Sequence, residues 1–188
     1  MKKDVFEIRI HGRGGQGGKT AAQFIAEAAM KDGKQIQAFP DYGPERTGAP
    51  VNSYVRISDE KIRLYQPIRH PDVVLVIDPT LPEVINVTEG LEEEGILVVN
   101  TTKTPEEIKK ELNFEGKVYT VDATKISIDV LGANRPNTPI LGAFAKVTGV
   151  VPIASIEDRI KAKFLKKIGE EKTQANIESV RRAYNEVR

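Results

Sequence analysis

The 188-residue sequence contains no cysteine and no tryptophan. Without cysteine, the chain cannot form a disulfide framework, use a thiolate nucleophile, or hold zinc or an iron–sulfur cluster through thiolate ligands. These absences exclude the small disulfide-stabilised folds and the cysteine-based enzymes. A chain of this length can still bury a sizeable hydrophobic core, so we expect one domain spanning residues 1–188.

Histidine and net charge are also scarce. The two histidines, His11 and His70, are far apart in the sequence and form no spaced pair of ligands, so we predict no metal site. The net charge of +1 gives no overall attraction to nucleic acid or to an anionic membrane. The sequence lacks a signal-peptide pattern and an apolar run of transmembrane length. We therefore expect a cytoplasmic protein that binds neither nucleic acid nor membrane.

Glycine, in contrast, is concentrated in residues 11–20, which read HGRGGQGGKT. Residues 5–10 alternate apolar and polar side chains as a strand does, and residues 21–31 are rich in helix-forming residues. A glycine loop between a strand and a helix presents backbone amides and the positive end of the helix dipole to an anion. This glycine loop predicts a phosphate or pyrophosphate site, and the candidate residues are Gly12, Arg13, Gly14, Gly15, Gln16, Gly17 and Lys19.

The glycine loop alone leaves the identity of the phosphate ligand open. Residues 12–17 fit the pattern G-x-G-x-x-G, which is typical of dinucleotide sites. The same residues suit an NAD-dependent oxidoreductase, in which Asp41 would bind a ribose hydroxyl. A tight turn in a purely structural subunit, with no ligand, is another interpretation.

A P-loop phosphotransferase is a third alternative. Lys19 and Thr20 resemble the end of a Walker A loop, and Asp78 follows an apolar run as a Walker B aspartate does. The first glycine of the Walker pattern would fall at Arg13, however, so the match fails by one residue.

The remaining pattern predicts an α/β fold. Residues 73–77 and 96–99 are apolar runs typical of buried parallel strands, residues 117–121 (KVYTV) are expected to form a third strand of this type, and residues 34–40 read as another strand. Residues 51–57 and 61–66 alternate and predict an antiparallel hairpin with a turn at 58–60. We expect a Rossmann-like, mainly parallel sheet flanked by helices, with this β-hairpin as an insertion and with further helices at the C-terminal end.

Helices are predicted at five further places. One runs through residues 84–91, and another begins at Thr104 with Pro105 in its first turn. Thr138 is expected to cap a buried helix that ends at Gly149. Two amphipathic helices follow, one starting at residues 155–158 and ending at Gly169 and one running to the C-terminus.

Two irregular segments are candidates for function. Residues 41–50 contain two glycines and two prolines, which exclude a regular element, and carry Asp41, Glu45 and Arg46. Residues 134–139 form the second segment. Loops that follow parallel strands gather at one edge of the sheet, so we expect the glycine loop, residues 41–50 and the residues after each apolar strand to lie together there.

Three segments together resemble one family. They are residues 11–17 (HGRGGQG), 39–50 (FPDYGPERTGAP) and 137–144 (NTPILGAF). In this combination the chain closely resembles the gamma subunits of the 2-oxoacid:ferredoxin oxidoreductases, and it is most similar to the pyruvate-type members. The resemblance covers residues 6–182. Many relatives have two adjacent arginines in the second segment, where this chain has Arg46 followed by Thr47.

The resemblance implies a subunit of an enzyme made of alpha, beta, gamma and delta chains. That enzyme decarboxylates pyruvate with coenzyme A and gives acetyl-CoA, CO2 and reduced ferredoxin. Thiamine diphosphate lies between its alpha and beta chains, its iron–sulfur clusters lie on chains other than this one, and the domain corresponding to this chain is associated with coenzyme A. The resemblance therefore predicts that Arg46 contacts coenzyme A or a neighbouring subunit, and that further interface or ligand positions are Asp41, Glu45, Thr47 and Asn137.

Overall fold

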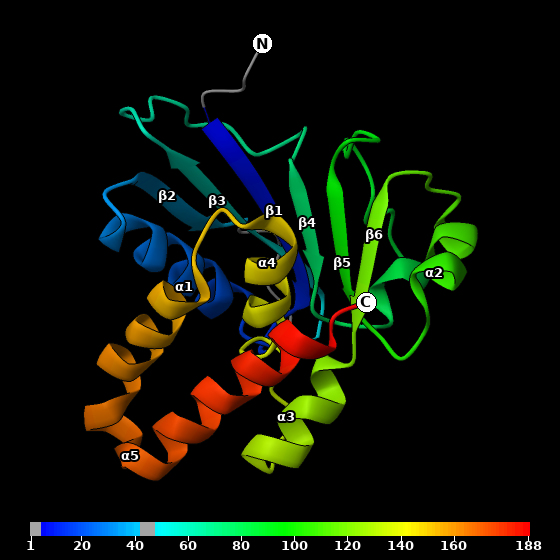
Figure 1. Cartoon of the computed structure of the whole chain (residues 1–188). Helices are drawn as coiled ribbons and strands as arrows, with labels where there is room; N and C mark the ends of the chain where they lie inside the picture. The colour runs from blue at the N-terminus through cyan, green and yellow to red at the C-terminus, as the bar shows by residue number, and fades with distance from the viewer. Residues whose placement is uncertain (1–4, 42–47) are drawn as a thin grey trace.

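A mixed β-sheet forms the centre of the molecule (Figure 1). The computed structural model describes residues 5–41 and 48–188. In this part of the chain the sheet has six strands in the order β2-β3-β1-β4-β5-β6. The strands β1, β4, β5 and β6 pair in parallel, whereas β3 is antiparallel to both of its neighbours, β1 and β2. The bounds are β1 Val5–Arg13, β2 Gln35–Pro40, β3 Pro50–Ser58, β4 Val73–Val76, β5 Ile96–Asn100 and β6 Lys117–Val121.

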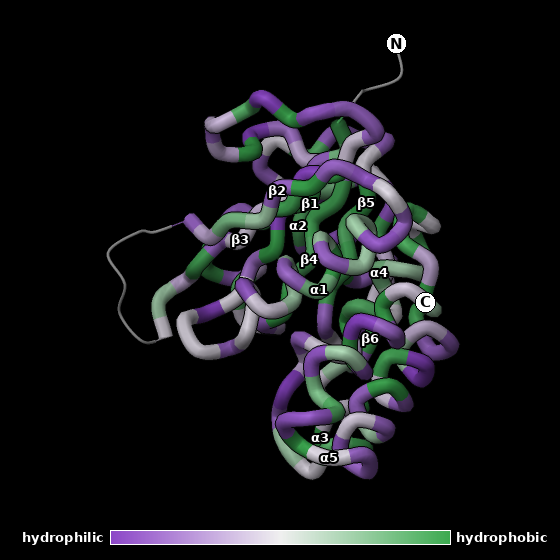
Figure 2. The backbone as a smooth tube through the Cα atoms, turned by 90° about the vertical axis from the view of Figure 1, so that its left-hand side faces the viewer, coloured by the Kyte–Doolittle hydropathy of each residue, from purple (hydrophilic) through white to green (hydrophobic). Residues whose placement is uncertain are grey.

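Helices cover the two faces of the sheet unequally (Figure 1). The first face packs against α1 (Gly18–Lys31), α4 (Ile140–Thr148) and α5 (Ile153–Glu186), with α3 (Ala123–Leu131) beside α5. The second face packs against α2 (Pro105–Leu112) and the segment that begins with the short 3-10 helix η1 (Leu81–Glu83). Figure 2 shows the hydrophobic residues concentrated along the central strands between these layers. The expected α/β architecture is confirmed.

The predicted hairpin of residues 51–57 and 61–66 is wrong. β3 pairs with β2 and β1, and residues 61–65 form no strand. The guanidinium of Arg56 donates hydrogen bonds to the carbonyls of Leu64 and Gln66, at 3.5 and 2.6 Å. The segment 61–66 therefore lies over the buried side chain of Arg56, and its alternating pattern does not reflect strand pairing.

The predicted helix at residues 84–91 is also wrong. The chain forms η1 and then a series of turns. The side chain of Asn86 accepts hydrogen bonds from the backbone amide and hydroxyl of Thr88, at 3.1 and 2.8 Å, and this local bonding competes with a helix. Gly90 then adopts a φ of 70°, which ends any continuation.

The other predicted helices are present, and the predicted starts of α4 and α5 differ from those observed. α2 has the expected cap, because Thr104 accepts a hydrogen bond from the amide of Glu107 and the Glu107 side chain accepts one from Thr104. Thr138 makes no cap for α4, since Pro139 occupies the cap position, but the helix ends at Gly149 as predicted. α5 begins at Ile153 and is interrupted at Gly169, where φ is 82° and ψ is 171°, so the predicted break between two helices is confirmed.

Candidate functional site

The glycine loop connects β1 to α1 at the carboxyl end of the parallel strands. Gly15 and Gly17 have φ values of 93° and 81°, a region that side-chain-bearing residues rarely adopt. The amide of Gly14 donates to the carbonyl of Ala49 at 3.0 Å, which ties the loop to the start of β3. The positive φ values therefore explain two of the glycines that the sequence pattern singled out.

The start of α1 offers backbone amides without a protein acceptor. The first helical hydrogen bond runs from the amide of Ala21 to the carbonyl of Gly17, at 2.9 Å. The amides of Gly18, Lys19 and Thr20 precede it, and within residues 5–41 and 48–188 no group accepts from them and no side chain caps the helix. Free amides at the positive end of a helix dipole favour an anion.

A hollow of about 240 Å³ lies between the glycine loop and residues 134–137. Gly17 is closely opposed by Asn137: a Cβ atom on Gly17 would come within 2.6 Å of the Asn137 amide nitrogen. The two segments that the sequence predicted to be functional thus form one concave surface. Asn137 brings a side-chain amide to the wall of this hollow.

Behind the glycine loop, a hydrogen-bonded network joins it to the end of β4. The Gln16 side chain accepts from the amide of Arg13 at 2.7 Å and donates to the carboxylate of Asp78. The Arg13 guanidinium donates to the Thr80 hydroxyl at 2.8 Å and to the carbonyl of Gly48 at 3.1 Å. Its Nε lies 3.4 Å from the Asp78 carboxylate. Arg13, a predicted ligand residue, therefore has its guanidinium engaged within the protein.

The other predicted site residues that the structure describes lie at the same edge of the sheet. Lys19 is exposed at the start of α1. Asp41 follows β2, donates its amide to the carbonyl of Asn52 at 2.9 Å, and accepts a hydrogen bond from the Tyr54 hydroxyl at 3.2 Å. Glu45, Arg46 and Thr47 lie outside the described residues.

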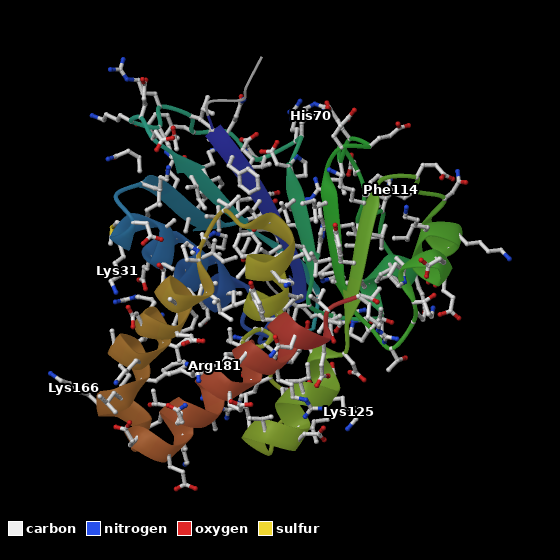
Figure 3. The ribbon with its side chains drawn as sticks, in the orientation of Figure 1. Lys31, His70, Phe114, Lys125, Lys166 and Arg181 are labelled. Atoms are coloured by element: carbon white, nitrogen blue, oxygen red, sulfur yellow. The ribbon has the colours of Figure 1, made fainter. Side chains whose placement is uncertain are left out.

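A second hollow, of about 400 Å³, lies where β5 and β6 end. Asn100 is fully buried beside it, donates to the carbonyl of Ile77 at 2.7 Å, and bonds both the amide and the hydroxyl of Thr124. Asp122 caps α3 by accepting from the amide of Lys125 at 2.8 Å. The expectation that the residues after the strands meet at one edge is confirmed for the described residues, and residues 42–47 of the expected loop lie outside them. In Figure 3 Lys125 lies at this end of the sheet and His70 at the opposite end.

Sequence reasoning missed a buried polar cluster on the second face of the sheet. His11 accepts a hydrogen bond from Arg9 at 3.0 Å, and Arg9 also donates to the carbonyl of Val87 at 3.2 Å. Burial and then the charge of Arg9 lower the pKa of His11 to about 3. The imidazole is therefore neutral at physiological pH, and its Nδ1 has no partner among the described residues. The charged positions within the strand of residues 5–10 were the signal available in the sequence.

The comparison with protein families agrees with this architecture. Residues 7–186 match the family described as pyruvate ferredoxin/flavodoxin oxidoreductase. The chain belongs to this family. Within the described residues no group of three or more His, Cys, Asp or Glu side chains is arranged to hold a metal ion. No helix in that part of the chain combines the length and the apolar character needed to cross a membrane.

Individual members of the oxidoreductase family match along nearly the full chain. The pyruvate synthase subunit PorC of Thermotoga maritima is 51% identical over 190 residues, which cover 100% of this chain and 97% of that protein. The common gamma subunit of the pyruvate/ketoisovalerate oxidoreductases of Thermococcus litoralis is 49% identical over 176 residues, covering 93% of this chain and 95% of that one. These similarities favour the oxidoreductase-subunit hypothesis over the NAD-dependent and P-loop alternatives.

Solved structures share the fold. The crystal structure of pyruvate oxidoreductase subunit PORC from Thermotoga maritima superposes with a TM-score of 0.88 at 48% identity, covering 99% of this chain and 98% of that one. The 2-oxoglutarate:ferredoxin oxidoreductase of Magnetococcus marinus, solved with 2-oxoglutarate, coenzyme A and succinyl-CoA bound, has a TM-score of 0.80 at 22% identity. That match covers 98% of this chain and 31% of the other, and it shows a common fold.

Proposed function

We propose that this chain is the gamma-type subunit of a pyruvate:ferredoxin oxidoreductase and that its glycine loop binds a phosphate group of coenzyme A. The observation that supports the site most directly is the set of α1 amides from which no described residue accepts a hydrogen bond, next to a hollow lined by Asn137. The 2-oxoacid oxidoreductase from Magnetococcus marinus, which shares the fold, was solved with coenzyme A.

The residues present fit a phosphate group. The amides of Gly18, Lys19 and Thr20 are available as donors, and the Asn137 side chain adds a donor from the opposite wall. Lys19 is exposed and carries a positive charge that suits the 3′-phosphate or the pyrophosphate of coenzyme A. Each charge-assisted bond of this kind contributes about 1.5–3 kcal/mol. A Cβ on Gly17 would occupy the space between the loop and Asn137, so the glycine keeps the cradle open.

The proposed task of this chain is to bind and orient coenzyme A for chemistry on other chains. The coenzyme A thiol supplies the acceptor for the acetyl group in the reaction that releases CO2 from pyruvate. Thiamine diphosphate and the iron–sulfur clusters are assigned to the alpha, beta and delta subunits, and ferredoxin accepts the electrons. The absence of cysteine here agrees with a subunit that carries no cluster. We expect the isolated chain neither to decarboxylate pyruvate nor to reduce ferredoxin.

The experiment compares Gly17→Ala with Gly33→Ala in the assembled enzyme. Both glycines have a φ of 81°, but Gly17 faces Asn137 whereas an added Cβ on Gly33, at the other end of α1, meets no atom within 4 Å. The positive φ is therefore matched, and the two substitutions differ in whether the added Cβ enters the cradle. We expect Gly17→Ala to raise the KM for coenzyme A at least tenfold with the KM for pyruvate unchanged, and Gly33→Ala to leave both unchanged.

Two results would contradict the proposal. If the assembled Gly17→Ala enzyme keeps its coenzyme A kinetics, the glycine loop is not the phosphate site. If the native chain does not co-purify with the other oxidoreductase subunits, the subunit assignment is wrong. The predicted contact of Arg46 with coenzyme A or with a neighbouring subunit remains a prediction, and Arg46→Ala with separate titrations of coenzyme A and of this subunit tests it.

A further inference from the structure

Asp78 sits behind the glycine loop, just beyond the end of β4, and only 6% of its surface is exposed. We propose that Asp78 is a positioning residue for the phosphate site, which holds the glycine loop in its binding conformation through the side chain of Gln16. This inference rests on the function proposed above. Asp78 itself faces the back of the loop and is assigned no contact with coenzyme A.

The Gln16 side chain is the link between the loop and the sheet. Its carbonyl oxygen accepts from the amide of Arg13, and its amide nitrogen donates to Asp78, so both ends of the side-chain amide are used. The amide of Gln16 also donates to the carbonyl of Arg13 at 3.0 Å, which closes a tight turn. Because Gly15 and Gly17 on either side have no side chains, the Gln16 side chain is the anchor available within residues 15–17.

The carboxylate of Asp78 is held firmly from its other side. Its second oxygen accepts from the amide of Thr80 at 2.9 Å and from the Thr80 hydroxyl at 2.5 Å. That hydroxyl accepts in turn from Arg13, which also reaches Gly48. Burial acts to raise the pKa of Asp78, but the hydrogen bonds from Thr80 and Gln16 and the charge of Arg13 lower it overall, so the carboxylate is ionised at neutral pH.

A positioning role and a purely electrostatic role of Asp78 predict opposite changes in coenzyme A affinity when its charge is removed. A carboxylate near a phosphate site repels the ligand, so its neutralisation should tighten coenzyme A binding if charge alone mattered. If the carboxylate instead keeps the loop in place, its removal should weaken binding despite the more positive site. The sign of the effect therefore distinguishes a positioning role from a general electrostatic one.

The experiment introduces Asp78→Asn into the assembled enzyme, with Asp158→Asn as the control. Asp158 pairs with Lys31, at the other end of α1 from the glycine loop, and its substitution makes the same change in charge. We expect Asp78→Asn to raise the KM for coenzyme A at least fivefold with little change in kcat, and the control to change neither. A KM for coenzyme A that is unchanged or lower in Asp78→Asn would overturn the positioning role.

A second measurement separates this inference from the proposed function. Amide hydrogen exchange of residues 13–18 in the complex without coenzyme A should be faster in Asp78→Asn than in the wild type. If exchange is unchanged, the positioning role is wrong. If exchange accelerates while the KM for coenzyme A stays the same, Asp78 holds the loop but the loop does not bind coenzyme A. That result overturns the proposed function, and with it the role of Asp78 in positioning a phosphate site.

A rescue variant tests the Gln16 link directly. Combining Asp78→Asn with Gln16→Glu exchanges the carboxylate and the amide, so that a donor–acceptor pair is restored and the acceptor for the Arg13 amide is kept. We expect the double variant to have a coenzyme A KM at least threefold lower than either single variant. A double variant as impaired as the singles combined would show that the two side chains act independently, against the proposed link.

Discussion

The second face of the sheet has an apolar half and a charged half. Over β4, β5 and β6 the buried side chains are apolar except for Thr120, and they pack against α2 and the segment 81–91. Over β1 and β3 the buried side chains include Arg9, His11 and Arg56, with the half-buried Glu7 paired to Arg56, on strands that pair directly with each other. The two halves meet where β1 pairs with β4, with Arg9 beside Val74 and His11 beside Val76.

The contrast between the two halves affects the register of the strands more than the stability of the fold. Buried ion pairs of this type are often no more stable than apolar side chains of similar volume, but removal of one partner is costly. A slip of one residue along β1 would turn the charged Arg9 and the neutral, polar His11 toward the apolar first face, so these two side chains fix the register of the strand that leads into the glycine loop. The apolar half contributes stability, and the charged half fixes the position of the site.

In the charged half, we expect the largest loss of stability from removing the side chain of Arg56, which is 1% exposed. Arg56→Ala removes the ion pair with Glu7, whose atoms lie 2.9 Å apart, and the hydrogen bond that Arg56 donates to the carbonyl of Gln66 at 2.6 Å. We expect a loss of about 3–5 kcal/mol in the free energy of unfolding, measured by urea denaturation. The double variant Glu7→Leu/Arg56→Met, which replaces both charged side chains by apolar ones, should lose less stability than Arg56→Ala. A loss below about 1 kcal/mol for Arg56→Ala would contradict the assignment of a buried ion pair.

In the apolar half, Leu97→Ala should have a slightly smaller effect. Leu97 is fully buried on β5, and its truncation leaves a cavity beside α2. We expect a loss of about 3 kcal/mol in the free energy of unfolding, within the range found for buried leucines. The coenzyme A KM of the assembled enzyme should not change, since Leu97 does not contact the glycine loop. A raised KM would mean that the two halves are coupled.

The smallest effect is a pH dependence of stability due to His11. The unfolded chain takes up a proton at this residue near its ordinary pKa of 6.5, whereas the folded chain does so only near 3. The unfolded state therefore binds more protons as the pH falls below 6.5, and stability should decrease by about 1 kcal/mol from pH 7 to 5.5. His11→Gln should flatten this part of the profile. Equal slopes in the wild type and in His11→Gln would exclude His11 as the cause.

The strands of the sheet could be predicted where the residues of a single strand are enough to identify it. β4 and residues 96–99 of β5 are continuous apolar runs, which indicate burial on both faces, and the structure has these strands and β6, which reads KVYTV, at the predicted positions. Segment 61–66 was mispredicted because the Arg56 side chain donates hydrogen bonds to its carbonyls, and segment 84–91 because the Asn86 side chain accepts hydrogen bonds from Thr88. The alternating pattern of residues 61–66 gives no sign of the bonds from Arg56.

The site was predictable to the same extent. The position of the glycine loop follows from local sequence, and its closeness to Ala49 follows from the direction of the strands, whereas its closeness to Asn137 was not predicted from the strands. The network behind the loop was not predicted, because Gln16 and Asp78 are 62 residues apart and neither stands in a recognisable motif with the other. The role of Arg13 changed for the same reason, since its partners Gly48 and Thr80 come from other strand ends.

The packing of α5 on α1 has a consequence for how the chain folds. Glu27 of α1 pairs with Arg159 of α5, 132 residues later in the sequence, and Phe24 stacks edge-on against Phe164. Contacts over such separations form slowly, because a long loop must close before they yield any stabilisation. During synthesis the apolar face of α1 therefore emerges long before the helix that covers it. We expect this face to be the surface that chaperones bind on the nascent chain, and docking of α5 to be a late step of folding.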